Sequence, residues 1–408
     1  MRTVRIAILG FGKIGSGTYD LLKDNKETIE KKTGCEFIVK RILDIRDFAG
    51  TEYESLVTGN IEDIVSDGEI SVVAEMMGGS HPAYEYTKAA LLSGKSVVTS
   101  NKEVVANFGS ELMRIAKENG VRYLFEASVG GGIPVIRPLY DDLAQNEVRQ
   151  IDGILNGTTN YILTQMFENG KSFEEALAEA QEKGYAEKDP TDDVGGKDAA
   201  RKISILASVA FGKSVHPDFI STEGISGIIS DNIRHASLMD SSIKLIGHAE
   251  CDSNGKIAIL VSPFIVSNDC PLSHIKGVFN GVLVNGRPVG DVMFYGRGAG
   301  KEPTASAVVS DLLDIVVHSG YISEYPIWES AGSEDVRTID DICFKRYLLV
   351  GSQEFEPEKY TSAKTVTLEQ GENYSAICTE VISGSDLKQI KNAIETSGIS
   401  VKSVINIL

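Results

Sequence analysis

An acidic segment followed by a lysine is the part of the sequence best suited to acid–base chemistry. It runs from Gly184 to Asp193, includes Glu187, and leads into a predicted helix that carries Asp198 and Lys202. Asp198 and Lys202 are four positions apart, so a helix places them on one face. Together with Glu187, they could hold an α-ammonium group and move a proton. The alternative is an ordinary intrahelical ion pair, which this spacing gives more often than not and which contributes about 0.3–0.5 kcal/mol.

A glycine-rich turn near the amino terminus is typical of dinucleotide binding. Gly10-Phe11-Gly12-Lys13-Ile14-Gly15 follows an apolar run and opens a predicted helix. The first glycine permits a tight turn, the second lets a pyrophosphate approach, and the third lets the helix pack on the strand. The spacing alone is a weak signal that also fits a plain strand-to-helix turn. The strand before it and the helix after it favour a cofactor site.

Two neighbouring residues after the second predicted strand point to different cofactors. Asp44 stands where an acid would bind a free ribose 2′-hydroxyl, as in NAD. Arg46, two residues on, would tolerate the 2′-phosphate of NADP. Both residues could equally belong to a solvated charged loop, so the sequence leaves the choice between NAD and NADP open.

Two further segments follow predicted strands, at the sheet edge where parallel strands collect ligands. They are Glu75 to Ser80, which includes Gly78, and Thr99 to Lys102, which includes Ser100. We predict that Gly78, Ser100 and Lys102 contact the cofactor, with Lys102 beside the nicotinamide. A lysine here could also be merely solvated.

The elements that would position these residues form an α/β pattern over the first 126 residues, typical of a doubly wound parallel sheet. Helices over Pro82–Ser93 and Val104–Asn119 are each predicted to end at a glycine. A late apolar helix, Ala305–His318, is expected to return to this sheet. The predicted strands are Val4–Leu9, Phe37–Leu43, Val72–Met76, Val97–Thr99 and Arg122–Phe125.

The composition excludes several classes of protein. With 408 residues, the chain exceeds one usual core of roughly 100–200 residues, so two or three domains are expected. Its 40 basic and 58 acidic residues give a net charge of −18, which repels nucleic acid. No apolar run is long enough for a membrane helix, no secretory signal begins the sequence, and the five cysteines form no CxxC pair. A cytoplasmic protein with a small-molecule substrate, and with neither nucleic acid nor membrane as partner, is expected.

Considered together, these residues make the chain resemble homoserine dehydrogenase. The resemblance rests on several long motifs that follow one another in the family's order over residues 1 to about 320. Beside the glycine turn they are Phe125–Pro134 (FEASVGGGIP), Gly153–Tyr161 (GILNGTTNY), Gly184–Thr191 (GYAEKDPT), and Gly296–Gly300 (GRGAG) with Pro303–Ala307. The resemblance implies NAD(P)-dependent hydride transfer between L-homoserine and L-aspartate 4-semialdehyde, in threonine and methionine biosynthesis.

By the same resemblance, Lys202 looks like the proton donor and acceptor, and Lys102 like the lysine between nicotinamide and substrate. Glu187, Asp193 and Asp198 look like substrate ligands, and Gly300 like a cofactor contact. A lysine works near neutral pH only if its pKa falls well below about 10.4, which burial beside a second cation would produce. The resemblance also implies a monovalent cation, sodium or potassium, held by backbone oxygens of Glu126, Val129, Gly131 and Ile133.

The implied fold is a Rossmann-type doubly wound domain, an α+β catalytic and dimerisation domain, and a small C-terminal ACT-like βαβ module. We expect the first over residues 1–134 with a return of about 304–340, the second over 135–303 and the third over 346–408, in a homodimer or homotetramer. The tail lacks the Asp-x-Pro-Gly-Val-Leu string of ACT domains, which makes feedback by threonine doubtful. Its predicted elements are strands Ser375–Ile382 and Ser400–Leu408 around a helix Asp386–Thr396.

Two other functions compete with this interpretation. A non-catalytic nucleotide sensor could keep the fold, but it would have no need of the lysine-bearing 184–202 segment. A dehydrogenase of another carbonyl compound is the second alternative. A substrate without an ammonium group would leave the carboxylates of Glu187 and Asp198 unpaired, which argues against it.

Overall fold

A computed structural model describes residues 2–318 and 325–408 and divides the chain into two compact units. Unit 1 comprises Met1–Gln145, Ser204–His216 and Gly296–Ser330, and unit 2 comprises Asn146–Ile203, Pro217–Tyr295 and Ala331–Leu408. In the part of the chain so described, no helix is long and apolar enough to cross a membrane.

Unit 1 is built on a six-stranded parallel sheet in the order β3-β2-β1-β4-β5-β6. This is the doubly wound order of a dinucleotide-binding fold, so the predicted fold class is confirmed. Its strands are β1 (Arg2–Leu9), β2 (Cys35–Leu43), β3 (Val57–Thr58), β4 (Ile70–Glu75), β5 (Ser96–Thr99) and β6 (Tyr123–Leu124), with a separate pair β8 (Lys213–Ser214) and β14 (Glu329–Ser330).

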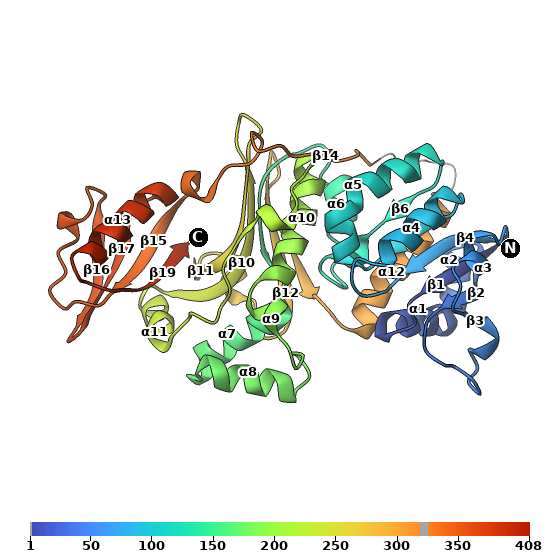
Figure 1. The fold of residues 1–408 in the computed structure, drawn as a ribbon, viewed down its shortest axis with the longest axis horizontal. Coiled ribbons are helices and arrows are strands. Elements are labelled where there is room, and N and C mark those ends of the chain that lie inside the picture. The colour runs from blue at the N-terminus through green and yellow to red at the C-terminus, as the bar shows by residue number, and fades with distance from the viewer. Residues whose placement is uncertain (1, 319–324) are drawn as a thin grey trace. The chain divides into compact units, whose positions relative to one another are not determined.

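Helices cover both faces of this sheet, and Figure 1 shows α4 and α5 on one side with α1 and α12 on the other. The predicted glycine stops after α4 and α5 are present, since Gly94 and Gly120 have φ of 77° and 66°. The helices are α1 (Lys13–Asp24), α2 (Lys26–Thr33), α3 (Glu62–Val65), α4 (Ala83–Leu92), α5 (Lys102–Glu118), α6 (Ile136–Tyr140) and α12 (Lys301–Val317), with 3-10 turns at Glu54–Leu56 and Glu126–Ser128.

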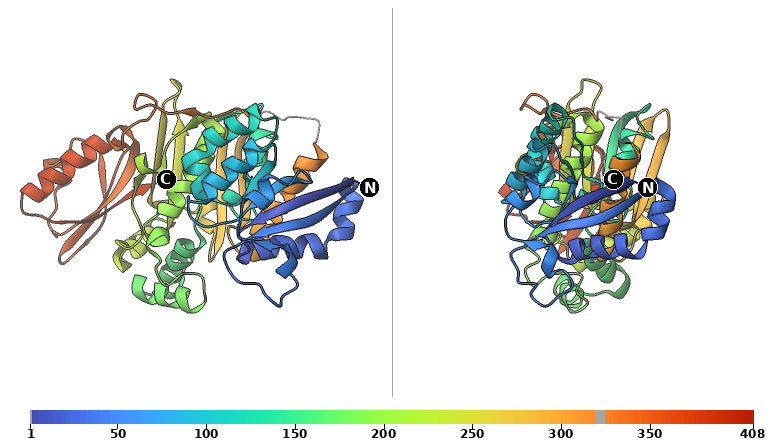
Figure 2. Two further views of the ribbon diagram at one scale, coloured as in Figure 1. Left: turned by 45° about the vertical axis from the view of Figure 1, so that its right-hand side comes forward. Right: turned by 90° about the vertical axis from the view of Figure 1, so that its right-hand side faces the viewer.

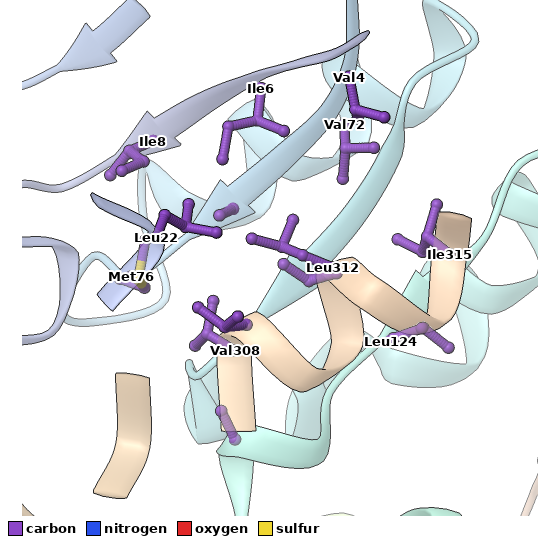
Figure 3. Close-up of a cluster of buried hydrophobic side chains, with 14 of the residues drawn as sticks. Val4, Ile6, Ile8, Leu22, Val72, Met76, Leu124, Val308, Leu312 and Ile315 are labelled. Carbon is purple, nitrogen blue, oxygen red and sulfur yellow. The ribbon is translucent and has the colours of Figure 1, made fainter. Parts of the chain in front are cut away.

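The core of unit 1 joins segments from opposite ends of the sequence. Ile6 and Ile8 of β1 face Val308 and Leu312 of α12 in one buried cluster (Figure 3). Burial of such side chains stabilises a fold by about 1.5–3 kcal/mol each. The late apolar helix therefore belongs to the first sheet, as its sequence predicts.

Unit 2 contains an eleven-stranded sheet whose main path is β13-β12-β7-β10-β11-β19-β15-β17-β16. The strands are β7 (Glu147–Ile154), β9 (Ser221–Thr222), β10 (Ser241–Cys251), β11 (Ile257–Ser267), β12 (Phe279–Arg287), β13 (Gly290–Arg297), β15 (Cys343–Val350), β16 (Thr365–Gly371), β17 (Tyr374–Thr379), β18 (Ile382–Ser383) and β19 (Val401–Ile407).

The helices of unit 2 carry the segments singled out in the sequence. They are α7 (Gly157–Asn169), α8 (Phe173–Glu182), α9 (Thr191–Val194), α10 (Lys197–Phe211, whose last turns belong to unit 1), α11 (Ser230–Leu238) and α13 (Gly384–Thr396). Short 3-10 turns lie at Pro217–Phe219, Pro271–His274, Ile339–Asp341 and Pro357–Lys359.

The carboxyl-terminal strands extend the sheet of unit 2, because β19 pairs in parallel with β11 through Phe264 and Asn406. Strand β15 lies between β17 and β19 and is antiparallel to both, so the predicted βαβ unit is split by an inserted strand. Helix α13 packs on one face of these strands through Ile390 and Ile394 (Figure 2). The ACT-like character of this segment stays a prediction.

Candidate active site

The glycine turn has the geometry that phosphate binding requires. Gly10 has a φ of 83°, and a Cβ added to Gly15 would lie 2.1 Å from the Gly10 carbonyl oxygen. A Cβ at Gly12 would meet nothing within 4 Å, and Gly12 caps α1 without any side-chain hydrogen bond. The first and third glycines therefore close the turn. The second leaves room beside the free amides of a helix N-terminus, which attract phosphate.

Asp44 and Arg46 are engaged with each other and with this turn. The Phe11 amide donates to Asp44 Oδ2 at 2.8 Å, and Arg46 Nη2 donates to the Phe11 carbonyl at 2.7 Å. Arg46 also donates to Asp44 through its backbone amide, Nε and Nη2 at 2.8–3.0 Å. The guanidinium lowers the pKa of Asp44 to about 2. The side chain of Asp44 is 8% exposed and that of Arg46 is 56% exposed, so the arginine is the outward-facing member of the pair.

A buried carboxylate lies at the carboxyl ends of β4 and β5. Glu75 is fully buried and accepts hydrogen bonds from the Thr99 hydroxyl at 2.5 Å and the Met77 amide at 2.7 Å. Burial raises the pKa of Glu75 to about 7. Asn101 caps the first turn of α5 and donates to the Gly79 carbonyl at 2.8 Å. Sequence reasoning gave these groups no role.

This network supports the residues predicted to contact the cofactor at the same edge of the sheet. Gly78 is exposed in the loop after β4, and the Ser100 amide donates to the Glu75 carbonyl at 3.2 Å. Lys102 is the first residue of α5 and is half-buried. The fold thus brings all three to the strand ends that the sequence indicated.

Two glycine motifs that lie far apart in the sequence pack closely together. A Cβ at Gly131 would lie 2.6 Å from the Gly298 carbonyl, and the Gly132 amide donates to the Arg297 carbonyl at 3.1 Å. Gly130 and Gly131 have φ of 74° and 54°. Side chains larger than hydrogen are therefore excluded where these turns meet.

Glu126, at the start of the first of these turns, has a role for its side chain that the sequence did not suggest. Its carboxylate accepts the amides of Val135, Ile136 and Arg137 at 2.7–2.8 Å, and so caps the N-terminus of α6. Glu126 as a whole is 4% exposed. Any cation ligand from Glu126 would therefore be its carbonyl oxygen, as with Val129 and Ile133, which are also buried.

Gly300, the remaining predicted cofactor contact, lies at the beginning of α12. Its φ is 126°, and it caps the helix without a side-chain hydrogen bond. A second helix N-terminus of unit 1 therefore begins at a glycine with no side chain to cover its amides.

A buried lysine forms the centre of the site in unit 2. Lys202 Nζ donates to Asp198 Oδ2 at 2.6 Å and to the Leu155 carbonyl at 2.8 Å. Lys202 and Asp198 are 9% and 5% exposed. Asp198 and Lys202 thus share one helix face, as predicted. Their ion pair is buried, however, and removing its charges from water costs far more free energy than forming an ion pair at the surface.

Asn156 connects this pair to the acidic segment and was missed by sequence reasoning. Its amide nitrogen donates to Asp198 Oδ2 at 2.9 Å and to Asp193 Oδ1 at 2.7 Å. Its amide oxygen accepts the Thr159 amide at 2.9 Å and so caps α7. An asparagine directly before Gly157 at a helix start is a capping signal, and that signal alone could have drawn attention to it.

Glu187 lies apart from this buried cluster. It is exposed, and its carboxylate makes no hydrogen bond or ion pair with another described residue, while its carbonyl accepts from the Gln181 side chain at 3.1 Å. Asp193, Asp198 and Lys202 are therefore brought together, whereas Glu187 faces solvent. Lys102 belongs to unit 1 and Lys202 to unit 2, so the convergence of the two amines stays a prediction.

Comparison with known proteins agrees with this geometry. Residues 10–126 match the family described as homoserine dehydrogenase, NAD binding domain, and residues 134–313 match the family described as homoserine dehydrogenase. A homoserine dehydrogenase of Bacillus subtilis is 37% identical over 95% of this chain and 90% of its own length. One of Synechocystis is 45% identical over 77% of this chain and 73% of its own length.

Solved structures give the same result. A homoserine dehydrogenase from Thiobacillus denitrificans superposes with a TM-score of 0.91 at 34% identity, over 100% of this chain and 99% of that one. A hyperthermophilic archaeal homoserine dehydrogenase in complex with NADPH has a TM-score of 0.65 at 30% identity, over 77% of this chain and 98% of its own. This chain therefore belongs to the homoserine dehydrogenase family, whose members are NAD(P)-dependent oxidoreductases.

Proposed function

We propose that the protein interconverts L-homoserine and L-aspartate 4-semialdehyde in the cytoplasm, as a step of threonine and methionine biosynthesis. The observation that carries this proposal is the buried Lys202, held by Asp198 and the Leu155 carbonyl. When bound, NAD(P) supplies or accepts the hydride at the terminal carbon of the substrate. The chain must then bind, orient and handle one proton on the substrate oxygen.

Lys202 is the group that moves this proton. Two of the three ammonium hydrogens have acceptors in Asp198 and Leu155, which aim the amine and leave the third for the substrate oxygen. In the reduction direction the ammonium donates a proton to the carbonyl oxygen, and in the oxidation direction the amine takes the hydroxyl proton. Lys102 orients the same oxygen from the cofactor side.

The carboxylates hold the amino group of the substrate. Asp198 is buried and shares Asn156 with the half-buried Asp193, and Glu187 is an exposed carboxylate without a charged protein partner among the described residues. An ammonium group would neutralise such a cluster, because buried carboxylates need a cation or hydrogen bonds. This preference favours an amino acid over an uncharged carbonyl compound.

For the cofactor, Gly10 to Gly15 and Gly300 fit the phosphates, and Gly78, Ser100 and Lys102 fit the nicotinamide end. We infer a preference for NADP, because all four hydrogen bonds accepted by Asp44 come from Arg46 and Phe11. A carboxylate so occupied cannot accept a ribose hydroxyl without losing one of them. The exposed guanidinium of Arg46 is instead suited to a 2′-phosphate.

A sodium or potassium ion would fit the carbonyl oxygens of Glu126, Val129, Gly131 and Ile133. The turn is buried, and its two left-handed glycines turn successive carbonyls, which are ligands that hard cations prefer. The ion would fix the turn that packs against Gly298. Rates measured with and without added sodium or potassium test this site.

We further propose a cofactor domain over 1–134 and about 304–340, a catalytic and dimerisation domain over 135–303, and an ACT-like module over 346–408, in a homodimer or homotetramer. The strand order β19-β15-β17-β16 with one helix on one face supports such a module, for which dimer building or plain structural support is the expected role. Light scattering of the purified chain tests the oligomeric state.

The direct test compares Lys202→Met with Lys197→Met, an exposed lysine on the same helix. Initial rates with homoserine and NAD or NADP should fall about 10²–10⁴-fold in the first variant, since positioned acid–base groups contribute that much. Rates of the second should match the wild type. Dinucleotide affinity, measured by fluorescence titration, should be unchanged in both.

A Lys202→Met enzyme that is folded by circular dichroism and turns over homoserine at the wild-type rate would remove this lysine from the mechanism. A wild-type chain that binds NADPH but reduces no semialdehyde would contradict the proposed reaction itself.

A further inference from the structure

Unit 2 contains a polar cavity that the proposed reaction does not use. It has a volume of about 430 Å³ and lies among β15, β19, the start of α13 and the segment 221–228. Charged residues on its wall are Glu223, Asp340, Arg346, Lys391 and Lys402. None of them belongs to the site around Lys202.

Arg346 on the wall of this cavity is a buried cation without a carboxylate. It is 2% exposed and forms no ion pair with an acidic residue among those that the structure describes. Its Nη1 donates to Asn406, its Nη2 makes a long contact of 3.4 Å with the Ile342 carbonyl, and its Nε has no partner. A guanidinium has five donor hydrogens, so most of its capacity is unused.

A buried arginine without an acidic partner is unusual, because buried charged side chains normally form ion pairs. The Phe344 ring, 5.2 Å from the guanidinium carbon, gives only a weak attraction. Burial lowers the pKa of Arg346 to about 10, so the side chain is still charged at neutral pH. The protein therefore maintains a desolvated positive charge beside an open volume.

The rest of the wall favours an anion of modest size. Lys391 and Lys402 also line the cavity and are exposed, and Lys402 Nζ donates to the Asn373 carbonyl at 3.3 Å. The two lysines add two positive charges to that of Arg346, against the negative charges of Glu223 and Asp340. This local excess is notable in a chain with a net charge of −18. Leu387 and Ile228 supply apolar wall that could contact a short aliphatic chain.

We propose that this cavity binds a small organic carboxylate, with the guanidinium of Arg346 as its anchor. Three of the five guanidinium hydrogens have no acceptor among the described residues, and a carboxylate offers two oxygens to such donors. Lys402 or Lys391 would attract the ligand. The pocket is separate from the lysine that moves the proton, so a ligand there would be additional to the substrate.

Isothermal titration of the full chain with succinate, at constant ionic strength, tests this site. Saturable 1:1 binding is expected in the wild type and in Lys202→Met, since the latter changes only the proposed catalytic lysine. Arg346→Met should weaken succinate binding about tenfold or more, the usual effect of losing a charged hydrogen bond. Lys402→Gln should weaken it severalfold, and Lys388→Gln, an exposed α13 lysine off the cavity wall, should not.

Inorganic phosphate is the second probe, because phosphate is the other anion that arginine commonly binds. Arg346-dependent phosphate binding that is as tight as succinate binding would overturn the carboxylate assignment. Succinate binding that is absent in the wild type, or unchanged in Arg346→Met, would overturn the site. If Arg346→Met does not fold, the Lys391→Gln/Lys402→Gln double variant takes its place, and unchanged succinate affinity there would equally overturn the proposal.

Discussion

Replacement of Arg46 by alanine should change which dinucleotide the enzyme prefers. In the wild type, Arg46 Nε and Nη2 donate to Asp44, and Nη2 also donates to the Phe11 carbonyl. Its side chain is 56% exposed, and Nη1 makes no hydrogen bond with a described residue, so Nη1 is the donor that we expect to contact a bound 2′-phosphate. The alanine variant removes this cation. It also releases two of the four hydrogen bonds that occupy Asp44, which can then accept from a free ribose hydroxyl.

The size of the effect follows from the charged hydrogen bond to the 2′-phosphate that alanine cannot make. A hydrogen bond between charged groups contributes about 1.5–3 kcal/mol, or roughly 10–100-fold in binding. Because the site is exposed, salt screens it, and the lower end of this range is expected at physiological ionic strength. The KM for NADPH should therefore rise about tenfold. The KM for NADH should stay the same or fall.

Initial rates with NADPH and with NADH at several salt concentrations measure this change. Arg114→Ala is the matched control, because Arg114 is an exposed arginine of unit 1 on α5. An equal loss with both cofactors would mean that Arg46 only braces the glycine turn. An unchanged KM for NADPH would show that Arg46 does not contact the cofactor at all.

Further substitutions test three other parts of the structure: the glycine turn, the Glu126 cap and the buried Glu75. Gly12→Ala should leave the melting temperature unchanged and weaken dinucleotide binding in a fluorescence titration, whereas Gly15→Ala should lower the melting temperature, because its Cβ would lie 2.1 Å from a carbonyl oxygen. A stable Gly15→Ala protein together with a destabilised Gly12→Ala protein would contradict these roles. Glu126→Ala should reduce the free energy of unfolding, measured in urea, by roughly 2–4 kcal/mol, because three backbone amides lose their acceptor. The control Glu118→Ala changes an exposed residue and should stay within about 0.5 kcal/mol of the wild type. An equal loss of stability in both variants would disprove the capping role of Glu126. Burial raises the pKa of Glu75 from 4.5 to about 7, so the folded protein binds a proton more tightly than the unfolded chain. This contribution to stability is complete below pH 4.5 and is lost as the pH rises towards 7, by about 3 kcal/mol relative to Glu75→Gln; parallel stability curves of the two proteins would refute it.

Local patterns in the sequence were sufficient for most of the main elements of unit 1, namely strands β1, β2, β4, β5 and β6 and helices α1, α4, α5 and α12. The predicted strand Val97–Thr99 is β5 (Ser96–Thr99), and the predicted helix Val104–Asn119 is α5 (Lys102–Glu118). Apolar periodicity and glycine stops depend only on residues close together in the sequence, so they can be recognised without knowledge of the fold. The two-residue strand β3 was missed because it is too short for any period.

The tail was predicted less well. Its helix and final strand are α13 and β19, close to the expected ranges, but their attachment was not foreseen. Pairing of β19 with β11 joins residues about 140 positions apart, and the insertion of β15 between β17 and β19 depends on the whole sheet. Strand order of this kind has no local signature.

The sequence by itself determined the glycine turn, the order of the elements and the shared helix face of Asp198 and Lys202, because each depends on spacing within one segment. The tertiary structure alone decided that Asn156 joins Asp198 to Asp193 and that Arg46 occupies Asp44. It alone also left the Nε atom of Arg346 without a partner among the described residues. The physical reason is that hydrogen-bond partners and burial depend on which distant segments the fold brings together, and no spacing along the chain records that choice.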